Sequence, residues 1–217
     1  MTRILLAGAT GMVGAATLSL LLADARVTQV VAPTRRPAPA HAKLLNPLIT
    51  SEALQPDAAW WAVDGAICAL GTTRAKAGSA AAFRAIDYDY VLAVARQVRR
   101  GGASRFALTS STGANAGSPF LYPRTKGEFE DAVGQLGFSS LTIVRPGLLG
   151  GKRTEHRPLE TVLGSLLRIA GPVLPASARI SPAAIVAALL VEAALNGTAG
   201  RHVITSKMIA LAASRCA

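Results

Sequence analysis

The sequence is poor in the residues that build disulfide frameworks and metal sites. Its 217 residues include two cysteines and three histidines, which lie far apart in the chain. Cys68 falls in an apolar run, where a cysteine is usually a small buried side chain, and His41, His156 and His202 are scattered. The sequence therefore predicts no disulfide, no metal centre and, by default, a cytoplasmic location.

Aromatic and acidic residues are also scarce. Aromatic residues make up 5% of the chain, and 12 acidic residues oppose 23 basic ones, which gives a formal net charge of +11. Such a charge invites a nucleic-acid partner, but stacking on bases needs aromatic side chains interleaved with the basic ones. Because the basic residues here are dispersed, we expect no nucleic-acid partner. An anionic cofactor or substrate would account for part of the excess charge.

Length and apolar content fit one α/β domain over residues 1–217. Hydrophobic residues make up 51% of the chain, which is enough for the two-sided core of a parallel sheet. Apolar runs alternate with helical patterns, which indicates β–α–β units. The expected strands are 4–7, 27–32, 44–49, 66–70, 106–109, 141–144 and 202–204, and the expected helices are near 12–24, 79–100, 122–136, 182–195 and 207–215. The proline-rich segment 33–43 predicts a loop or a shortened helix.

A glycine-rich segment, GATGMVG at residues 8–14, directly follows the first expected strand. Gly8 suits a tight turn, Gly11 lets a ligand approach the backbone, and Gly14 lets helix and strand pack closely. The first turn of the next helix offers unpaired N–H groups and the positive end of its dipole, which together hold a pyrophosphate. The residues expected at this dinucleotide site are Gly8, Thr10, Gly11, Met12, Val13 and Gly14.

Residues 4–23 contain no charged residue, a feature also typical of a secretion signal or a membrane span. A span has no need of three glycines at three-residue spacing directly after a short strand. Residues 27–32 also predict a second strand, as expected after a phosphate-binding helix. We therefore expect residues 12–24 to form a helix of a soluble domain, with no membrane partner.

A second signature is the tyrosine–lysine pair of YPRTK, at Tyr122 and Lys126. On a helix these residues share one face, and Pro123 suits the first helical turn. Upstream, Ser110 and Ser111 follow an expected strand, at the edge where ligands of open α/β sheets bind. A neighbouring ammonium favours the phenolate of a tyrosine, and a serine hydroxyl can bind a substrate oxygen. The spacing alone is typical of an exposed helix face, but its order after the glycine turn and the hydroxyl cluster favours a hydride-transfer site.

Five segments together resemble the short-chain dehydrogenase/reductase superfamily, as an atypical or extended-like member. They are GATGMVG at 8–14, ALGTTRAKAGS at 69–79, LTSSTGA at 108–114, YPRTKGE at 122–128 and VRPGLLGGKR at 144–153. GTTRAKAGS, KGE and RPG are most similar to the branch of Tat-interacting-protein-like oxidoreductases and their bacterial relatives. The resemblance covers essentially the whole chain. It implies a Rossmann-type doubly wound parallel sheet of about seven strands with a small C-terminal substrate region.

The resemblance also implies roles for the tyrosine–lysine motif and the hydroxyl cluster. Tyr122 would be the general acid/base, and Lys126 would favour its phenolate form and hold the nicotinamide ribose. Ser111 would orient the substrate oxygen, with Ser110 as the alternative.

Two further segments are implied to contact the cofactor. Gly71 and Thr72 would pack on its ribose and pyrophosphate. Arg145, Pro146 and Gly147 would close over the nicotinamide end, with backbone atoms near the carboxamide.

The end of the second expected strand indicates which nicotinamide cofactor is bound. Thr34, Arg35 and Arg36 stand where NAD-preferring sites place an acidic residue. Guanidinium groups pair with a 2′-phosphate, and a threonine hydroxyl can donate to it. The sequence therefore predicts NADP(H) over NAD(H), against the alternative of two exposed loop arginines. At the third strand, Thr50 and Ser51 stand where relatives usually place an Asp that contacts adenine.

The expected function is an NADP(H)-dependent oxidoreductase that moves hydride to or from a small carbonyl or alcohol substrate. One alternative is an epimerase or dehydratase with the same tyrosine–lysine pair, and another is an NADP(H)-sensing binding protein with vestigial catalysis. Residues 147–181 are the expected substrate region, where Arg153, His156 and Arg157 either bind an acidic group or lie in a solvated loop. The sequence leaves open a homodimer or a protein partner.

Overall fold

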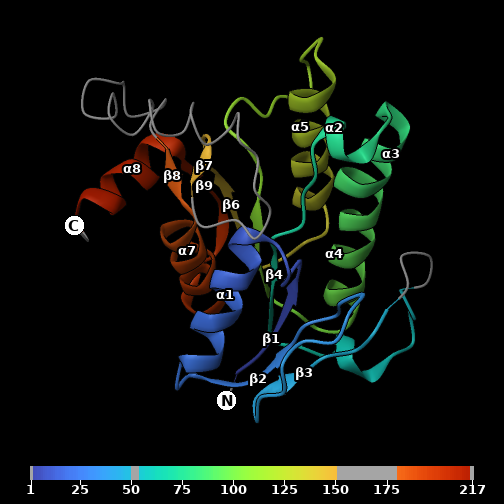
Figure 1. Cartoon of the computed structure of the whole chain (residues 1–217), viewed down its shortest axis with the longest axis vertical. Coiled ribbons are helices and arrows are strands. Elements are labelled where there is room, and N and C mark those ends of the chain that lie inside the picture. The colour runs from blue at the N-terminus through green and yellow to red at the C-terminus, as the bar shows by residue number, and fades with distance from the viewer. Residues whose placement is uncertain (1, 50–53, 151–179, 216–217) are drawn as a thin grey trace.

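A seven-stranded parallel sheet forms the centre of the computed structural model, which describes residues 2–49, 54–150 and 180–215 (Figure 1). Its strand order is β3-β2-β1-β4-β5-β6-β9. The strands are β1 (Thr2–Ala7), β2 (Val27–Val31), β3 (Leu44–Leu45), β4 (Gly65–Cys68), β5 (Arg105–Thr109), β6 (Ser140–Arg145) and β9 (Gly200–Thr205). The order reverses direction between β1 and β4, and open α/β sheets bind ligands at such a point, outside the carboxyl ends of the strands. The expected Rossmann-type fold class is thereby confirmed.

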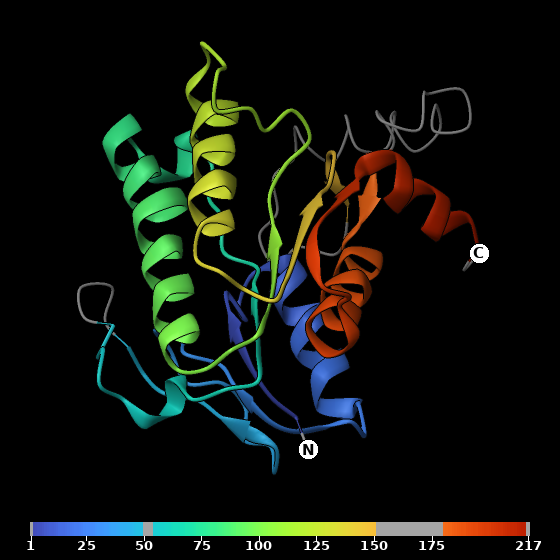
Figure 2. The same ribbon diagram turned by 180° about the vertical axis from the view of Figure 1, so that it is seen from behind.

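Helices cover both faces of the sheet (Figures 1 and 2). One face carries α1 (Met12–Ala23), α7 (Ala183–Asn196) and α8 (Ser206–Arg215), and the other carries α3 (Ala80–Arg84), α4 (Val91–Arg100) and α5 (Leu121–Gly134). Strand β1 supplies both apolar cores, because successive side chains of a strand point to opposite faces. Ile4 and Leu6 pack with α1 and α7, whereas Leu5 and Ala7 pack with α4 and α5.

The expected strands and helices occur in the expected order, with one strand much shorter than predicted. Residues 44–49 were expected to form a strand, but β3 has only two residues, Leu44–Leu45. Pro47 has no N–H to donate and interrupts the ladder, which resumes as a single parallel bridge between Thr34 and Leu48. Residues 33–43 form a loop, as the prolines predicted.

The helix expected over residues 79–100 is divided into three pieces. α3 begins after Ser79, whose hydroxyl oxygen accepts a hydrogen bond from the Ala82 N–H at 3.0 Å. A π-helical segment, η2 (Ala85–Tyr90), follows and leads into α4. Single π-helical turns inside α-helices occur frequently at functional sites. A short helix, α2 (Arg74–Ala77), precedes all three.

The ends of the expected substrate region are held together beside the main sheet. β7 (Leu149–Gly150) pairs in parallel with β8 (Ser181–Pro182) in a separate two-stranded sheet. Arg153, His156, Arg157, Thr50 and Ser51 lie outside the described residues.

Residues 4–23 are divided between β1 and α1, with the glycine-rich turn between them. Of the helices that the structure describes, none combines the length and the apolar character needed to cross a membrane.

Candidate functional site

The glycine-rich turn joins β1 to α1 at the carboxyl edge of the sheet. Gly8 has φ +89°, a left-handed conformation that favours glycine, and a Cβ there would lie 2.8 Å from the backbone nitrogen of Leu70. A Cβ on Gly14 would lie 1.9 Å from the carbonyl oxygen of Gly8. The turn packs so closely against α1 and the end of β4 that neither position has room for a side chain, which explains why both are glycine.

The first turn of α1 leaves a place for an anionic group. Gly11 caps this helix, and within the described residues no side chain bonds to the cap. Thr10 and Gly11 are exposed and Met12 is half-buried, whereas the side chain of Val13 is turned into the core. The free N–H groups at this helix end fit a diphosphate.

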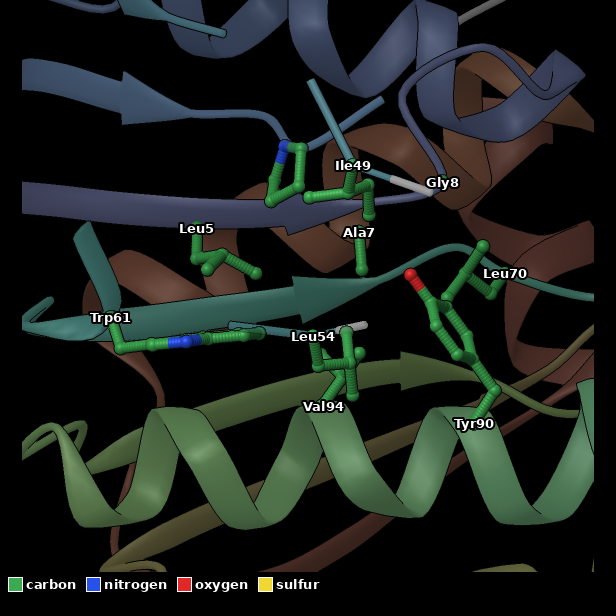
Figure 3. A pocket seen from close by; sticks show the side chains of 10 residues that line it. Leu5, Ala7, Gly8, Ile49, Leu54, Trp61, Leu70, Tyr90 and Val94 are labelled. Atoms are coloured by element: carbon green, nitrogen blue, oxygen red, sulfur yellow. The ribbon is translucent and has the colours of Figure 1, made fainter. Parts of the chain in front are cut away.

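An apolar pocket lies beside the turn, between the carboxyl ends of β1 and β4 and the helix α4 (Figure 3). Its empty volume is about 280 Å³, a figure that includes space open to solvent. The lining residues are Leu5, Ala7, Gly8, Pro33, Ile49, Leu54, Trp61, Leu70, Tyr90 and Val94. Its walls are apolar and aromatic, which suits a flat ring.

Arg35 carries its positive charge near this pocket. Burial raises the pKa of Tyr90, and the positive charge of Arg35 opposes that rise, so the guanidinium lies within electrostatic reach of the pocket wall. Arg35 and Arg36 are both exposed. Both side chains are therefore accessible to an anionic ligand.

Thr34 has a different contact from the one expected. Its hydroxyl donates to the Arg36 carbonyl oxygen at 2.6 Å and accepts from the Asn46 amide at 2.8 Å. Since a hydroxyl has one proton to donate, Thr34 shapes the arginine loop in this structure rather than offering a donor to a phosphate. Asn46, which the sequence did not single out, also donates to the Ala32 carbonyl oxygen at 2.6 Å.

Tyr122 and Lys126 lie one turn apart on α5, as the spacing predicted. The Tyr122 side chain is 40% exposed, and its ring centroid lies 5.5 Å from that of Phe83. The Lys126 side chain is 4% exposed and forms an ion pair with Asp87, a fully buried residue of η2. The Tyr122 side chain is thus partly accessible, whereas the Lys126 ammonium is buried in an ion pair.

The two candidate serines have different surroundings. Ser110 is buried, and its hydroxyl donates to a Glu130 carboxylate oxygen at 2.5 Å. Ser111 is half-buried, and its hydroxyl makes only a long contact, 3.4 Å, to the Thr112 carbonyl oxygen. The geometry leaves the hydroxyl of Ser111 available to a ligand and that of Ser110 engaged.

Glu130 also holds Arg145. The guanidinium donates to its carboxylate through Nε at 2.9 Å and Nη2 at 2.5 Å, and these bonds raise the pKa of Arg145. The Arg145 side chain is therefore turned toward α5, which leaves only backbone of residues 145–147 to line the site. The Pro146 carbonyl oxygen accepts from the Thr112 N–H at 2.9 Å, and the Gly147 N–H donates to the Ser181 hydroxyl at 3.1 Å.

The segment after β4 lies close to the ammonium of Lys126. A Cβ on Gly71 would lie 3.8 Å from the Lys126 ammonium nitrogen, and the Thr72 N–H donates to Asp87 at 2.7 Å. Of the described residues that the sequence singled out, the structure thus gathers the glycine turn, Gly71, Thr72 and Lys126 around neighbouring strand ends.

Cys68 at the end of β4 is a structural residue. Burial raises the pKa of its thiol to about 12, so it is not a nucleophile near neutral pH.

Two buried carboxylates, Asp87 and Glu130, were missed by sequence reasoning. Asp87 lies four residues after Phe83 and four before Val91, both buried, so it occupies the apolar stripe of its helix. Glu130 lies four residues after the buried Lys126 and next to the buried Phe129. A charged residue on an apolar stripe is the signal that could have found them.

Comparisons with known proteins place this geometry among nucleotide-binding folds. No protein-family model matches the chain. The chain is 39% identical over 171 residues to "Protein fmp52, mitochondrial" of Emericella nidulans, covering 75% of this chain and 73% of the relative. Among solved structures, Bordetella bronchiseptica WbmH in complex with NAD+ matches with a TM-score of 0.69 and 14% identity, covering 95% and 76% of the two chains. A UDP-N-acetylglucosamine 4-epimerase from Methanobrevibacter ruminantium M1 matches with a TM-score of 0.71 and 11% identity, covering 94% and 76%.

These likenesses support one prediction and contradict another. The structural matches show the fold of NAD-binding short-chain dehydrogenase/reductase proteins. The prediction of a cytoplasmic location is wrong, because the relatives are named as mitochondrial proteins. That prediction depended on the absence of disulfide and metal signals, which does not distinguish one reducing compartment from another.

Proposed function

The chain belongs to the Fmp52 family, and from its site we propose that it is an NADP(H)-dependent oxidoreductase of a small carbonyl or alcohol substrate. The observation that carries the proposal is that the glycine turn and the buried Lys126 both adjoin the segment after β4, the turn at Leu70 and the ammonium at Gly71. Three further features support the proposal. They are the first turn of α1 without a side-chain cap, the 40% exposed side chain of Tyr122, and the Ser111 hydroxyl, whose contact to the Thr112 carbonyl oxygen is long at 3.4 Å. Within the superfamily, we place the chain beside the Tat-interacting-protein-like branch, because it carries the GTTRAKAGS, KGE and RPG elements.

The residues present fit an extended NADP(H) molecule. The apolar pocket beside Tyr90 would take the adenine, and the first turn of α1 would take the diphosphate. Arg35 and Arg36 at the pocket rim would pair with the 2′-phosphate. Gly8 and Gly14 support the fit, since a Cβ at either position would disrupt the turn that forms this cradle.

The remaining residues would act on the substrate. Bound NADPH supplies the hydride. Ser111 would donate a hydrogen bond to the substrate carbonyl oxygen, and the phenol of Tyr122 would deliver a proton to that oxygen. Lys126 would hold the nicotinamide ribose from below, beside Gly71, and favour the phenolate that Tyr122 becomes. Backbone atoms of Pro146 and Gly147 would bound the nicotinamide end.

Removing the phenol hydroxyl tests the catalytic assignment. We expect Tyr122→Phe to lower NADPH-dependent turnover of a carbonyl panel by about 100- to 10,000-fold, the usual contribution of a general acid. NADPH affinity should stay within about twofold, because the phenol contacts substrate rather than the dinucleotide. Binding is measurable by energy transfer from the buried Trp61 of the pocket to the reduced nicotinamide.

The outcomes separate the proposal from its alternatives. An epimerase would convert its substrate without net consumption of NADPH, whereas a sensor would bind NADPH and turn over no member of the panel. Full turnover by Tyr122→Phe would contradict the catalytic role of the tyrosine.

The cofactor preference has its own test in the arginine loop. We expect Arg35→Ala combined with Arg36→Ala to weaken NADPH binding about 10- to 100-fold and to leave NADH binding nearly unchanged, because only NADPH carries the 2′-phosphate. Lys43→Ala, which removes one positive charge from a side chain that donates to the Asp24 carbonyl oxygen, is the control for a loss of positive charge elsewhere, and it is compared with each single arginine variant. Equal losses for NADPH and NADH would contradict the assignment.

A further inference from the structure

A buried carboxylate, Asp87, stands against Lys126 and has no part in the scheme above. Asp87 is fully buried, Lys126 is 4% exposed, and the two form an ion pair. The second carboxylate oxygen of Asp87 accepts the Thr72 N–H at 2.7 Å. Burying a charge without a partner costs several kcal/mol, so each of the two ions depends on the other for its place in the protein.

Three segments of the chain meet at this carboxylate. A Cβ on Gly71 would lie 3.7 Å from Asp87 Oδ1 and 3.8 Å from Lys126 Nζ, so the backbone after β4 passes directly over the ion pair. Asp87 comes from η2 and Lys126 from α5. The carboxylate therefore connects the loop expected at the cofactor ribose to the side chain expected to hold that ribose.

The helix that carries Asp87 departs from regular geometry at this residue. η2 is π-helical between two α-helical pieces, and Asp87 lies within it. A π-helical turn inserts an extra residue and changes the direction of the side chains around it. The irregular backbone thus coincides with the position at which an acidic side chain enters the apolar stripe.

We propose that Asp87 is a positioning residue, which fixes the ammonium of Lys126 under the Gly71–Thr72 backbone before the cofactor binds. The inference rests on the proposed function. An ammonium has three N–H donors, so Lys126 can form its ion pair with Asp87 and still donate to the ribose hydroxyls. The carboxylate also balances the buried positive charge, which lets Lys126 keep this place in the cofactor-free protein.

The test is a double-mutant cycle read as NADPH affinity. Asp87→Asn keeps the shape and removes the charge, and we expect it to raise the Kd for NADPH by about 10- to 100-fold, as for partners that orient ligand-binding side chains at metal sites. Added to Lys126→Met, the same substitution should change the Kd by less than about twofold, because Asp87 acts through the lysine. Additive losses in the cycle would overturn the proposal.

The control is Asp89→Asn, the same substitution at an exposed residue of η2. It should leave the Kd for NADPH unchanged. A comparable loss in Asp89→Asn would assign the effect to the net charge of the segment and overturn the proposal.

A measurement on the unaltered protein covers the case in which Asp87→Asn does not fold. The hydrogen bond from Thr72 to Asp87 should slow exchange of the Thr72 amide proton without NADPH. Exchange at the rate of a solvent-exposed amide would overturn the pre-formed arrangement.

Failure of the proposed function gives a separate result. Absence of NADPH binding to the unaltered protein would overturn both proposals. NADPH binding that Asp87→Asn leaves intact would overturn this one alone.

Discussion

Replacing Glu130 by alanine is expected to lower the free energy of unfolding by about 3–5 kcal/mol, the usual loss when one partner of a buried ion pair is removed. Glu130 is fully buried and accepts hydrogen bonds from Ser110 and, through two nitrogens, from Arg145. Its removal would leave the half-buried guanidinium of Arg145 without this carboxylate and the buried Ser110 hydroxyl without its acceptor. Urea unfolding followed by circular dichroism measures the loss.

The same helix provides the matched control. Glu128 pairs with Arg84, but their side chains are 31% and 43% exposed. Exposed pairs contribute about 0–1 kcal/mol, so Glu128→Ala should be nearly neutral. Equal losses for Glu128→Ala and Glu130→Ala would show that the buried network does not stabilise the strand ends as the geometry indicates.

Gly14→Ala is expected to abolish dinucleotide binding, with a Kd for NADPH raised at least about 100-fold, or about 2.7 kcal/mol. The added Cβ would lie 1.9 Å from the Gly8 carbonyl oxygen, and both groups belong to backbone that cannot turn aside as a side chain can. The turn must open, which moves the N–H groups of α1 away from the diphosphate. Titration with NADPH, followed by energy transfer from tryptophan, measures the effect.

Gly134→Ala is the control, because it makes the same substitution at a helical glycine of α5. Apart from the adjacent residues and the backbone of the same helix, no atom of the described structure lies within 4 Å of a Cβ at Gly134. Alanine is favoured over glycine in a helix by about 1 kcal/mol or less, so this variant should be at least as stable as the unaltered protein. NADPH binding by Gly14→Ala at the unaltered affinity would contradict the proposed cradle.

The parts of the fold that depend on local patterns were predictable from sequence. The run before GATGMVG and the glycines themselves specify a strand, a turn and a helix, and β1 and α1 lie where they were expected. The short β3 was not predicted. The apolar residues of 44–49 favour a strand over the whole run, whereas Pro47, which has no N–H, shortens it to two residues.

The parts of the site that depend on contacts between distant segments were not predictable. Ser110 and Ser111 are alike in sequence, and only the position of Glu130 on another element distinguishes them. The role of Asp87 likewise depends on residues distant in sequence. Lys126 on α5 lies 39 residues after Asp87, and Thr72 beyond the end of β4 lies 15 residues before it.

The parallel pair β7–β8 has a consequence for how this scaffold could diversify. Leu149 pairs with Ser181, so the two ends of the expected substrate region lie side by side. The entropy of closing a loop grows only slowly with its length. Insertions or exchanges between these two anchor points would therefore cost the Rossmann framework little, and selectivity could evolve there while the nucleotide cradle is inherited unchanged.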